Sequence, residues 1–247
     1  MGLRRFASLA RIDTSDSLRP PGFDLMLLIV SILGAALVAI QPLTQPHTAA
    51  AIILNPTLFA TSIFLALRSA GGITGLIQSG LAQVYMAYPV SRIQLLLVLL
   101  ASRILAPALA LMSAPLLVAA VILYPVVSSD PESYLVMFSA YLGQAILYGL
   151  AFTLISLRAR SPGTATIASI TFYFAYIVSS ILMATLSPAL REPLLGELAD
   201  AMSLYVVVNR YLSGATVDVW QLALVPSLVA ILFLAVVAYF TRRFEPV

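Results

Sequence analysis

The sequence predicts an all-α polytopic membrane protein with six transmembrane helices and both termini in the cytoplasm. Composition is the first reason, because 61% of the 247 residues are hydrophobic and only 9% are charged, whereas soluble domains carry roughly 25% charged residues. The second reason is that six apolar stretches approach or exceed the ~20 residues that cross a bilayer as a helix. The third is that arginines, the source of all 13 basic charges, mostly occupy alternate gaps between these stretches, as cytoplasmic loops do.

The apolar stretches define the spans and the domain organisation. Residues 1–22 form a cytoplasmic amphipathic segment, and residues 23–247 form the six-helix transmembrane domain. We place the spans at residues 23–40, 49–67, 93–124, 134–157, 163–186 and 220–240. The cytoplasmic gaps are then residues 1–22, 68–92, 158–162 and 242–247, and the other gaps hold mostly acids or no charge.

The N-terminal segment is predicted to form a helix in the inner headgroup layer. Leu3, Phe6 and Ala10 fall on one helical face, while Arg4 and Arg11 fall on another. A disordered basic leader is the alternative. A signal peptide is a further alternative, but the leader is long and contains several aspartates, which a typical charged leader lacks. We therefore retain the first span.

The third span is too long for a straight crossing. It contains Pro107 and Pro115, so we expect it to start at the cytoplasmic interface and to be kinked within the membrane. Arg103 then lies one to two turns inside. Its guanidinium is expected to snorkel to the headgroups or to pair with a backbone carbonyl, and contact with an anionic substrate is the alternative.

The segments on the outer side differ in length. His47, the single histidine, lies in a short first loop and is expected at the surface. The segment of residues 187–219 is too long for a structureless loop. We predict one or two short interfacial or re-entrant helices there, bounded by Pro188 and Pro193 at one end and by Gly214 at the other. These helices would form an outer gate with Leu204, Tyr205 and Tyr211.

Between the second and third spans, residues 76–88 are predicted to form an amphipathic cytoplasmic helix after a glycine-rich stretch. Apolar side chains recur there at spacings of three or four residues, and Pro89 ends the helix. These side chains are Ile77, Leu81, Val84, Tyr85 and Tyr88.

Several function classes are excluded by what the chain lacks. Without cysteine there is no disulfide framework or thiolate metal site. The glycines at 71–75 do not match a phosphate-binding loop, and the chain has no lysine to complete one. The chain has no second histidine that could bind a metal together with His47, and the sequence places no serine beside His47 for which it could act as the base. We therefore predict neither an enzyme nor a metal site. The arginines form no stripe, which argues against nucleic acid binding. The acids map to termini, loops or span edges, so ion-coupled transport is not favoured.

The motif "YPVSR" at Tyr88–Arg92 follows the amphipathic segment and opens the third span. It resembles the "PxSR" signature at the start of span three in permease subunits of the type-two ABC transporter family. The basic helix before the first span, the cytoplasmic turn "LRARSPGTA", the long segment before the last span and the terminal "TRRFE" are similar to that family as well.

The resemblance implies a half-transporter of the cell membrane that works as an exporter. It would pair with a second permease chain, as homodimer or heterodimer, and with two cytoplasmic ABC ATPase subunits. ATP and Mg would bind to those ATPases, and no cofactor binds this chain. The helix that contacts the ATPase maps to residues 76–88, with Pro89 and Arg92. Spans two and five would flank the substrate path with Asn55, Thr61, Tyr173 and Tyr176. A membrane-anchoring or assembly subunit and a secondary carrier are the alternatives.

Overall fold

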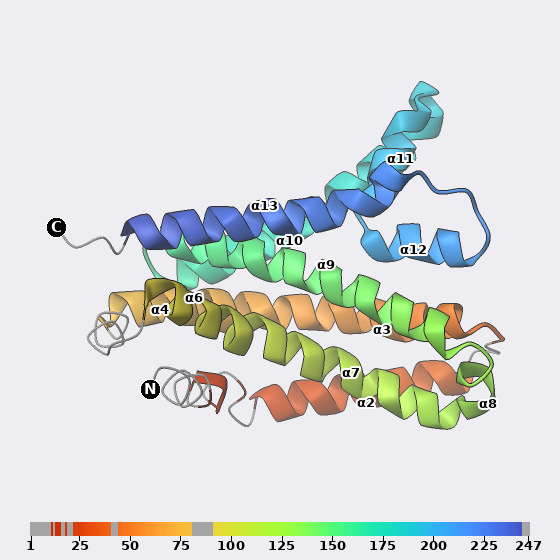
Figure 1. Ribbon diagram of the computed structural model, residues 1–247, viewed down its shortest axis with the longest axis horizontal. Helices are drawn as coiled ribbons and strands as arrows, with labels where there is room; N and C mark the ends of the chain where they lie inside the picture. The colour runs from red at the N-terminus through yellow and green to blue at the C-terminus, as the bar shows by residue number, and fades with distance from the viewer. Residues whose placement is uncertain are drawn as a thin grey trace.

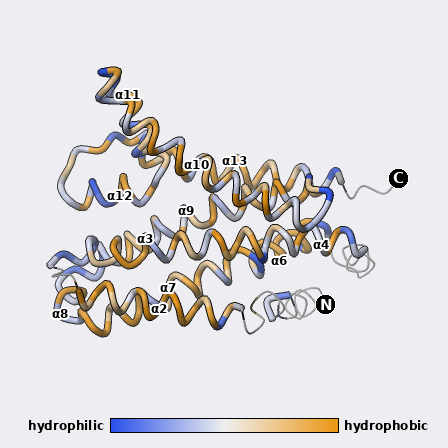
Figure 2. Tube along the Cα trace, turned by 180° about the vertical axis from the view of Figure 1, so that it is seen from behind, coloured by the Kyte–Doolittle hydropathy of each residue, from blue (hydrophilic) through white to orange (hydrophobic). Residues whose placement is uncertain are grey.

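We analysed a computed structural model of the chain (Figure 1). The structure describes residues 11, 13–15, 18, 22–40, 44–80 and 91–243. Within these residues the regular structure is entirely helical, and six helices are long and apolar enough to cross a membrane. Figure 2 shows that apolar residues dominate the long helices. The prediction of an all-α chain with six candidate membrane spans is therefore confirmed.

Two of the six spans are interrupted by a π-helical segment. Span one is α2 (Gly22–Ile40), span four is α9 (Pro131–Arg158), span five is α10 (Pro162–Leu190) and span six is α13 (Val219–Arg243). Span two consists of α3 (Pro46–Phe64), the π segment η1 (Leu65–Ala70) and α4 (Gly71–Gln78). Span three consists of α6 (Arg92–Leu100), the π segment η2 (Ala101–Leu105) and α7 (Ala106–Ile122). The short helices are α8 (Tyr124–Val127), α11 (Pro193–Ala201) and α12 (Leu204–Leu212).

Spans two, three and four form the centre of the bundle. More than half of each of their most apolar windows is buried within the protein, whereas about a fifth or less is buried in spans one, five and six. Helix α9 contacts α3, α10, α12 and α13. Gly149 of α9 allows its close approach to span three, because a Cβ atom there would overlap the side chain of Ile104. Small residues permit such close helix packing in membranes.

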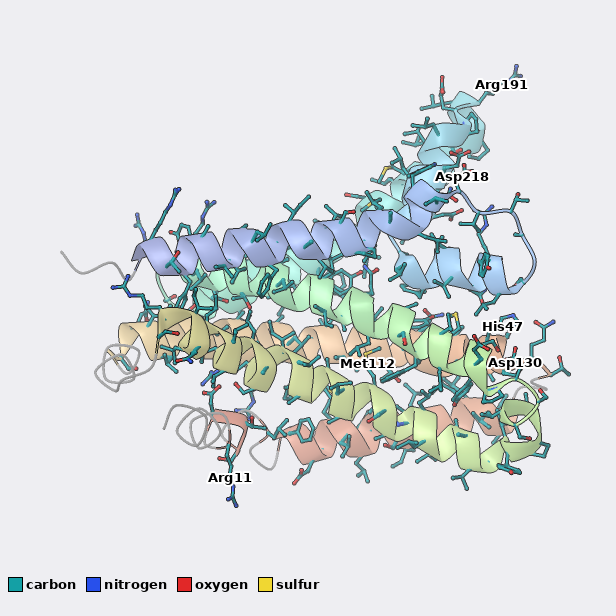
Figure 3. The ribbon with its side chains drawn as sticks, in the orientation of Figure 1. Arg11, His47, Met112, Asp130, Arg191 and Asp218 are labelled. Atoms are coloured by element: carbon teal, nitrogen blue, oxygen red, sulfur yellow. The ribbon has the colours of Figure 1, made fainter. Side chains whose placement is uncertain are left out.

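Helices α9 and α13 each begin beside an acid and end at an arginine. Helix α9 begins after Asp130 and ends at Arg158. Helix α13 runs the same way, from Asp218 to its arginine-bearing end at Arg242. His47 and Asp130 lie at one end of the molecule and Arg11 lies at the other (Figure 3). This separation agrees with the arginine pattern of the sequence.

Helix α9 begins with a side-chain cap. The Asp130 carboxylate accepts a hydrogen bond from the backbone N–H of Ser133 at 3.1 Å, which satisfies one of the free donors of the first turn. This hydrogen bond, together with a second from the Ser133 hydroxyl, lowers the pKa of Asp130. The loop before α9 is therefore fixed at its junction with the span.

The glycine-rich stretch does not end span two, so residues 76–78 belong to this span and not to the separate helix predicted over residues 76–88; the part of that helix beyond residue 80 stays a prediction. Gly71 and Gly72 lie in a continuous helix that ends at Gln78. A Cβ atom on Gly71 would lie 3.1 Å from the Thr166 hydroxyl of α10, so these glycines serve close packing. The chain turns at Gly80, whose φ of 73° favours glycine. Residues 81–90 lie outside the described residues.

In the third span, a kink was predicted, and the structure has a π-helical turn at Ala101–Leu105. The π segment η2 comes directly before Pro107, which has no N–H to donate to the carbonyl of Arg103 four residues earlier. The hydroxyl of Ser69, in the π segment of span two, donates to this carbonyl instead. The two π segments are therefore joined by a hydrogen bond. Such segments often occur at functional sites.

The prediction of short helices between spans five and six is confirmed, with different boundaries. Pro188 lies inside α10, which continues to Leu190. The chain then reverses at Arg191, whose φ is 55°, and forms α11 along α10, followed by α12. His47 is also placed differently from the prediction. It lies in the first turn of α3, is buried, and its Nε2 is 3.4 Å from the Ser213 hydroxyl.

Candidate functional site

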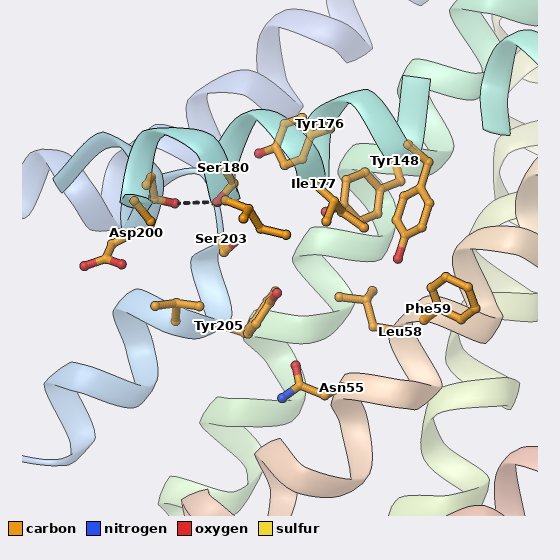
Figure 4. Close-up of a pocket in the computed structure, with 15 residues that line it drawn as sticks. Asn55, Leu58, Phe59, Tyr148, Tyr176, Ile177, Ser180, Asp200, Ser203 and Tyr205 are labelled. Carbon is orange, nitrogen blue, oxygen red and sulfur yellow. Dashed lines mark hydrogen bonds between the residues drawn. The ribbon is translucent and has the colours of Figure 1, made fainter. Parts of the chain in front are cut away.

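Helices α3, α9, α10, α11 and α12 enclose a cavity of ≈400 Å³ (Figure 4). Pockets for small molecules are typically apolar with a few polar groups that orient the ligand. The lining here is mixed in this way. It consists of Asn55, Leu58, Phe59, Tyr148, Tyr173, Tyr176, Ile177, Ser180, Ile181, Ala184, Ala199, Asp200, Ser203, Tyr205 and Val206.

Asn55 is the polar group that α3 contributes. Its amide oxygen accepts a hydrogen bond from the Tyr141 hydroxyl at 2.8 Å. The Tyr141 ring in turn stacks on Tyr205 of α12, with centroids 4.4 Å apart. The amide nitrogen of Asn55 has two N–H donors and its oxygen keeps a second lone pair, so the side chain can both donate to and accept from a ligand.

The turn between α11 and α12 is fixed to the bundle by buried polar side chains. Gln144 of α9 is fully buried. Its Nε2 donates to the carbonyl of Met202 at 3.3 Å, and its Oε1 accepts from the N–H of Leu204 at 3.1 Å. The Tyr176 hydroxyl of α10 also donates to the Met202 carbonyl. Two spans therefore hold this turn beside the cavity.

One wall of the cavity consists of tyrosine rings. Tyr148 of α9 makes edge-to-face contacts with Tyr173 and Tyr176 of α10, with centroids 5.1 Å and 5.4 Å apart. Phe59 of α3 extends the wall through a contact with Tyr173 at 6.0 Å. Edge-to-face pairs stabilise one another by about 0.5–1.5 kcal/mol beyond their burial. The wall thus presents rigid aromatic surface with polar edges.

The charge of the cavity is low. Asp200 is the one ionisable carboxylate or guanidinium among its lining residues, and it forms an ion pair with Arg210 of α12. The net arrangement suits a neutral amphipathic molecule better than an ion. Such a ligand would contact the aromatic wall and form a small number of hydrogen bonds.

The structure brings together residues that the sequence predicted for two different roles. Asn55, Tyr173 and Tyr176 were predicted for the substrate path and Tyr205 for the outer gate, and all four line this cavity. Thr61 does not. It is fully buried in α3, and its hydroxyl has no hydrogen-bond partner among the described residues.

Leu204 and Tyr211, the other predicted gate residues, do not line the cavity. Leu204 packs over Gly143 of α9, and Tyr211 is 60% exposed. Sequence reasoning missed Tyr148 and Ser180. Both lie in apolar spans, where only the orientation of the helix decides which face meets the cavity.

Two residues of the predicted ATPase contact are described, and the rest are not. Ile77 lies in the last turns of α4 and packs against the core. Arg92 begins α6 directly after Ser91, whose side chain caps the helix. Leu81, Val84, Tyr85, Tyr88 and Pro89 lie outside the described residues.

Arg103 is paired with a carboxylate, which corrects the predicted snorkelling. Its Nη2 lies 2.6 Å from Oδ1 of Asp13, and its Nε also donates to this carboxylate. The Ser102 hydroxyl donates to the same group. Asp13 is only 3% exposed, and Arg103 is 7% exposed. The leader thus supplies an acid to the bundle, although the sequence placed all acids at the periphery.

Comparison with known proteins gives no match to a protein-family model and none to a curated protein.

Proposed function

We propose that the chain is the permease subunit of an ATP-driven ABC exporter of the type-two family, located in the cell membrane. The observation that carries the proposal is the aromatic and polar cavity, because it unites Asn55, Tyr173, Tyr176 and Tyr205. The sequence predicts three of these residues for the substrate path and Tyr205 for the outer gate. Cargo is a neutral amphipathic molecule, in agreement with the low charge of the lining.

The energy source is a separate ATPase. Ion-coupled carriers use carboxylates in the membrane that bind and release protons or cations. The buried carboxylate that the structure describes beside the spans, Asp13, is held by the Arg103 guanidinium. A carboxylate neutralised in this way favours a structural role over ion exchange, so the secondary carrier is the weaker alternative.

The orientation that we propose places the arginine-bearing end in the cytoplasm. Both termini and the turn around Ser161 are then inside, and the loop around Ser129 is outside. Two cytoplasmic ABC ATPase subunits bind at residues 76–92, where the "PVSR" motif lies. A second permease chain packs on the half of α10 that lines the cavity, because only 11% of the most apolar window of α10 is buried within this chain. This packing would place the cavity between two subunits.

Cysteine labelling tests the orientation, because the native chain contains no cysteine. Ser161→Cys and Ser129→Cys are each labelled with a membrane-impermeant maleimide in intact cells. We expect labelling at Ser129→Cys and protection at Ser161→Cys until the cells are opened. The reverse pattern would refute the proposed topology.

The transport role is tested by co-expression with an ABC ATPase encoded beside this gene. ATP-dependent export of Nile red, a neutral aromatic dye, is measured in inverted vesicles, together with ATP hydrolysis. Tyr205→Ala should reduce export, because Tyr205 lines the cavity. Tyr124→Ala is the matched control, because Tyr124 is 70% exposed and outside the lining. Equal export by both variants would show that the cavity is not part of the transport path.

The ATPase contact is tested separately. Leu81→Asp and Tyr85→Asp place charge on two of the apolar side chains predicted to contact the ATPase, so we expect loss of ATPase assembly. Assembly that persists in both variants contradicts the contact. A chain that binds the ATPase but supports no export of any tested cargo would favour the assembly-subunit alternative.

A further inference from the structure

A second hollow lies at the arginine-bearing end of the bundle, away from the aromatic cavity. It has a volume of ≈420 Å³ and is lined by Ile155, Arg158, Ala159, Arg160, Thr164 and Ala168. The lining residues come from the last turn of α9, the turn that follows it and the first turns of α10. Helix α9 contacts both α10 and α13, and the hollow lies where α9 joins α10.

The charge of this hollow is entirely positive. Arg158 and Arg160 are both exposed, and neither forms an ion pair with any residue in the described part of the chain. The lining contains no acid. Arginine, with its planar fork of donors, binds phosphate by paired hydrogen bonds.

The fold restrains the side chain of Arg158 and the backbone of Arg160. The Arg158 guanidinium lies over the ring of Tyr239 in α13, 5.2 Å from its centroid, which restricts the side chain by a cation–π contact. The carbonyl of Arg160 accepts a hydrogen bond from the amide of Gln78 in α4. The backbone that carries Arg160 is therefore anchored to span two.

The remainder of the hollow is apolar apart from Thr164, and it extends from the arginines into the two candidate spans. Ile155 lies about one turn before Arg158 in α9, and Ala168 lies nearly two turns into α10. Ile167, the neighbour of Ala168 in α10, is 67% exposed and adds apolar surface beside the hollow. A ligand at this position meets positive charge at the membrane surface and apolar side chains towards the bilayer interior.

We propose that this hollow binds the headgroup of an anionic phospholipid. The phosphate contacts Arg158 and Arg160, and an acyl chain lies along Ile155, Ala168 and the exposed face of α10. Basic pockets between spans on the cytoplasmic side of membrane proteins bind such headgroups. This inference needs only the six spans and their charged end, so it is independent of the proposed transport function.

The test compares lipid retention in matched variants of the full chain. Wild-type protein, Arg158→Gln/Arg160→Gln and Arg242→Gln are reconstituted in nanodiscs of phosphatidylcholine with phosphatidylglycerol, extracted, and analysed by native mass spectrometry. Arg242 is an exposed arginine at the same end but outside the lining. Each arginine near an anionic surface contributes roughly 1 kcal/mol, or about a fivefold change in affinity. We therefore expect the double variant to lose phosphatidylglycerol and Arg242→Gln to retain it.

Two further measurements identify the ligand. Arg158→Lys/Arg160→Lys keeps the charge but lacks the planar fork, so its retention should be intermediate. Inorganic phosphate should not displace the lipid, because phosphate cannot occupy the apolar wall. Equal retention by the Gln double variant and Arg242→Gln overturns the proposal, as does complete displacement by phosphate, which indicates a free-anion site. Unchanged lipid retention with lost ATPase assembly would identify the arginines as a protein contact instead.

Discussion

Replacement of Asp13 by asparagine is expected to destabilise the bundle strongly. Asparagine has nearly the same shape but no charge, so the Arg103 guanidinium loses its counter-ion. The pair is almost completely buried, at 3% and 7% exposure, and is joined by contacts of 2.6, 3.1 and 3.2 Å. Removing one partner of such a pair costs about 3–5 kcal/mol, because the other charge stays buried and unpaired.

A second variant tests whether the loss of stability comes from the unpaired charge of Arg103. Asp13→Asn/Arg103→Gln removes both charges, and replacing a buried pair by neutral groups is often close to neutral. We expect this double variant to recover most of the lost stability. Asp24→Asn is the control, because Asp24 lies in the first turn of α2 and is exposed.

Thermal unfolding in one detergent, followed by the loss of monodisperse protein with temperature, measures the effect. We expect the wild type and Asp24→Asn to unfold at the highest temperature, the double variant at a lower temperature and Asp13→Asn at the lowest. If Asp13→Asn unfolds with the wild type, the buried pair does not stabilise the bundle and the reasoning fails. If the double variant is less stable than Asp13→Asn, hydrogen bonding by Arg103 matters more than its charge.

Three other predictions concern helix packing and capping, and thermal unfolding measures each of them. Gly149→Ala should cost about 1–3 kcal/mol by overpacking, since its methyl group would overlap Ile104; Ile104→Ala in the same chain should restore part of this, and no loss would contradict the close packing. Gln144→Leu should cost about 1–3 kcal/mol, because it frees backbone groups of the α11–α12 turn; an unchanged unfolding temperature would contradict this role. The Asp130 cap stabilises α9 above the ordinary pKa of the carboxyl and is lost as the pH falls through its lowered pKa. Asp130→Ala should remove this part of the acid sensitivity, and an unchanged pH profile would refute it.

The spans could be predicted from the sequence because each is a long apolar run between charges. Their ends were less predictable where the chain contains glycine or proline. Gly71 and Gly72 look like a helix break, yet tertiary packing against α10 and Arg103 makes them favourable inside the helix. Pro188 likewise looks like a boundary, but α10 continues through it. Local propensity was outweighed by packing in both cases.

The cavity could be predicted only in part. Asn55, Tyr173, Tyr176 and Tyr205 are polar or aromatic residues in otherwise apolar segments, so composition identifies them. Their meeting point depends on how α12 folds back over α3 and α9, which no local pattern encodes. The contact between Asp13 and Arg103 joins residues that are 90 positions apart. A basic leader gives no indication that one of its acids is buried.

The two π segments have a consequence for how spans two and three can move. Each wide turn contains more residues than an α-helical turn, and one residue corresponds to about 100° around the helix axis. If the wide turn shifts by one residue along the chain, that residue rotates while the helix on either side keeps its hydrogen bonds. Because Ser69 donates to the carbonyl of Arg103, a shift in one segment displaces the hydrogen-bond partner of the other. The residues that the two wide turns pass are therefore expected to reorient together, while the helices on either side keep their orientation.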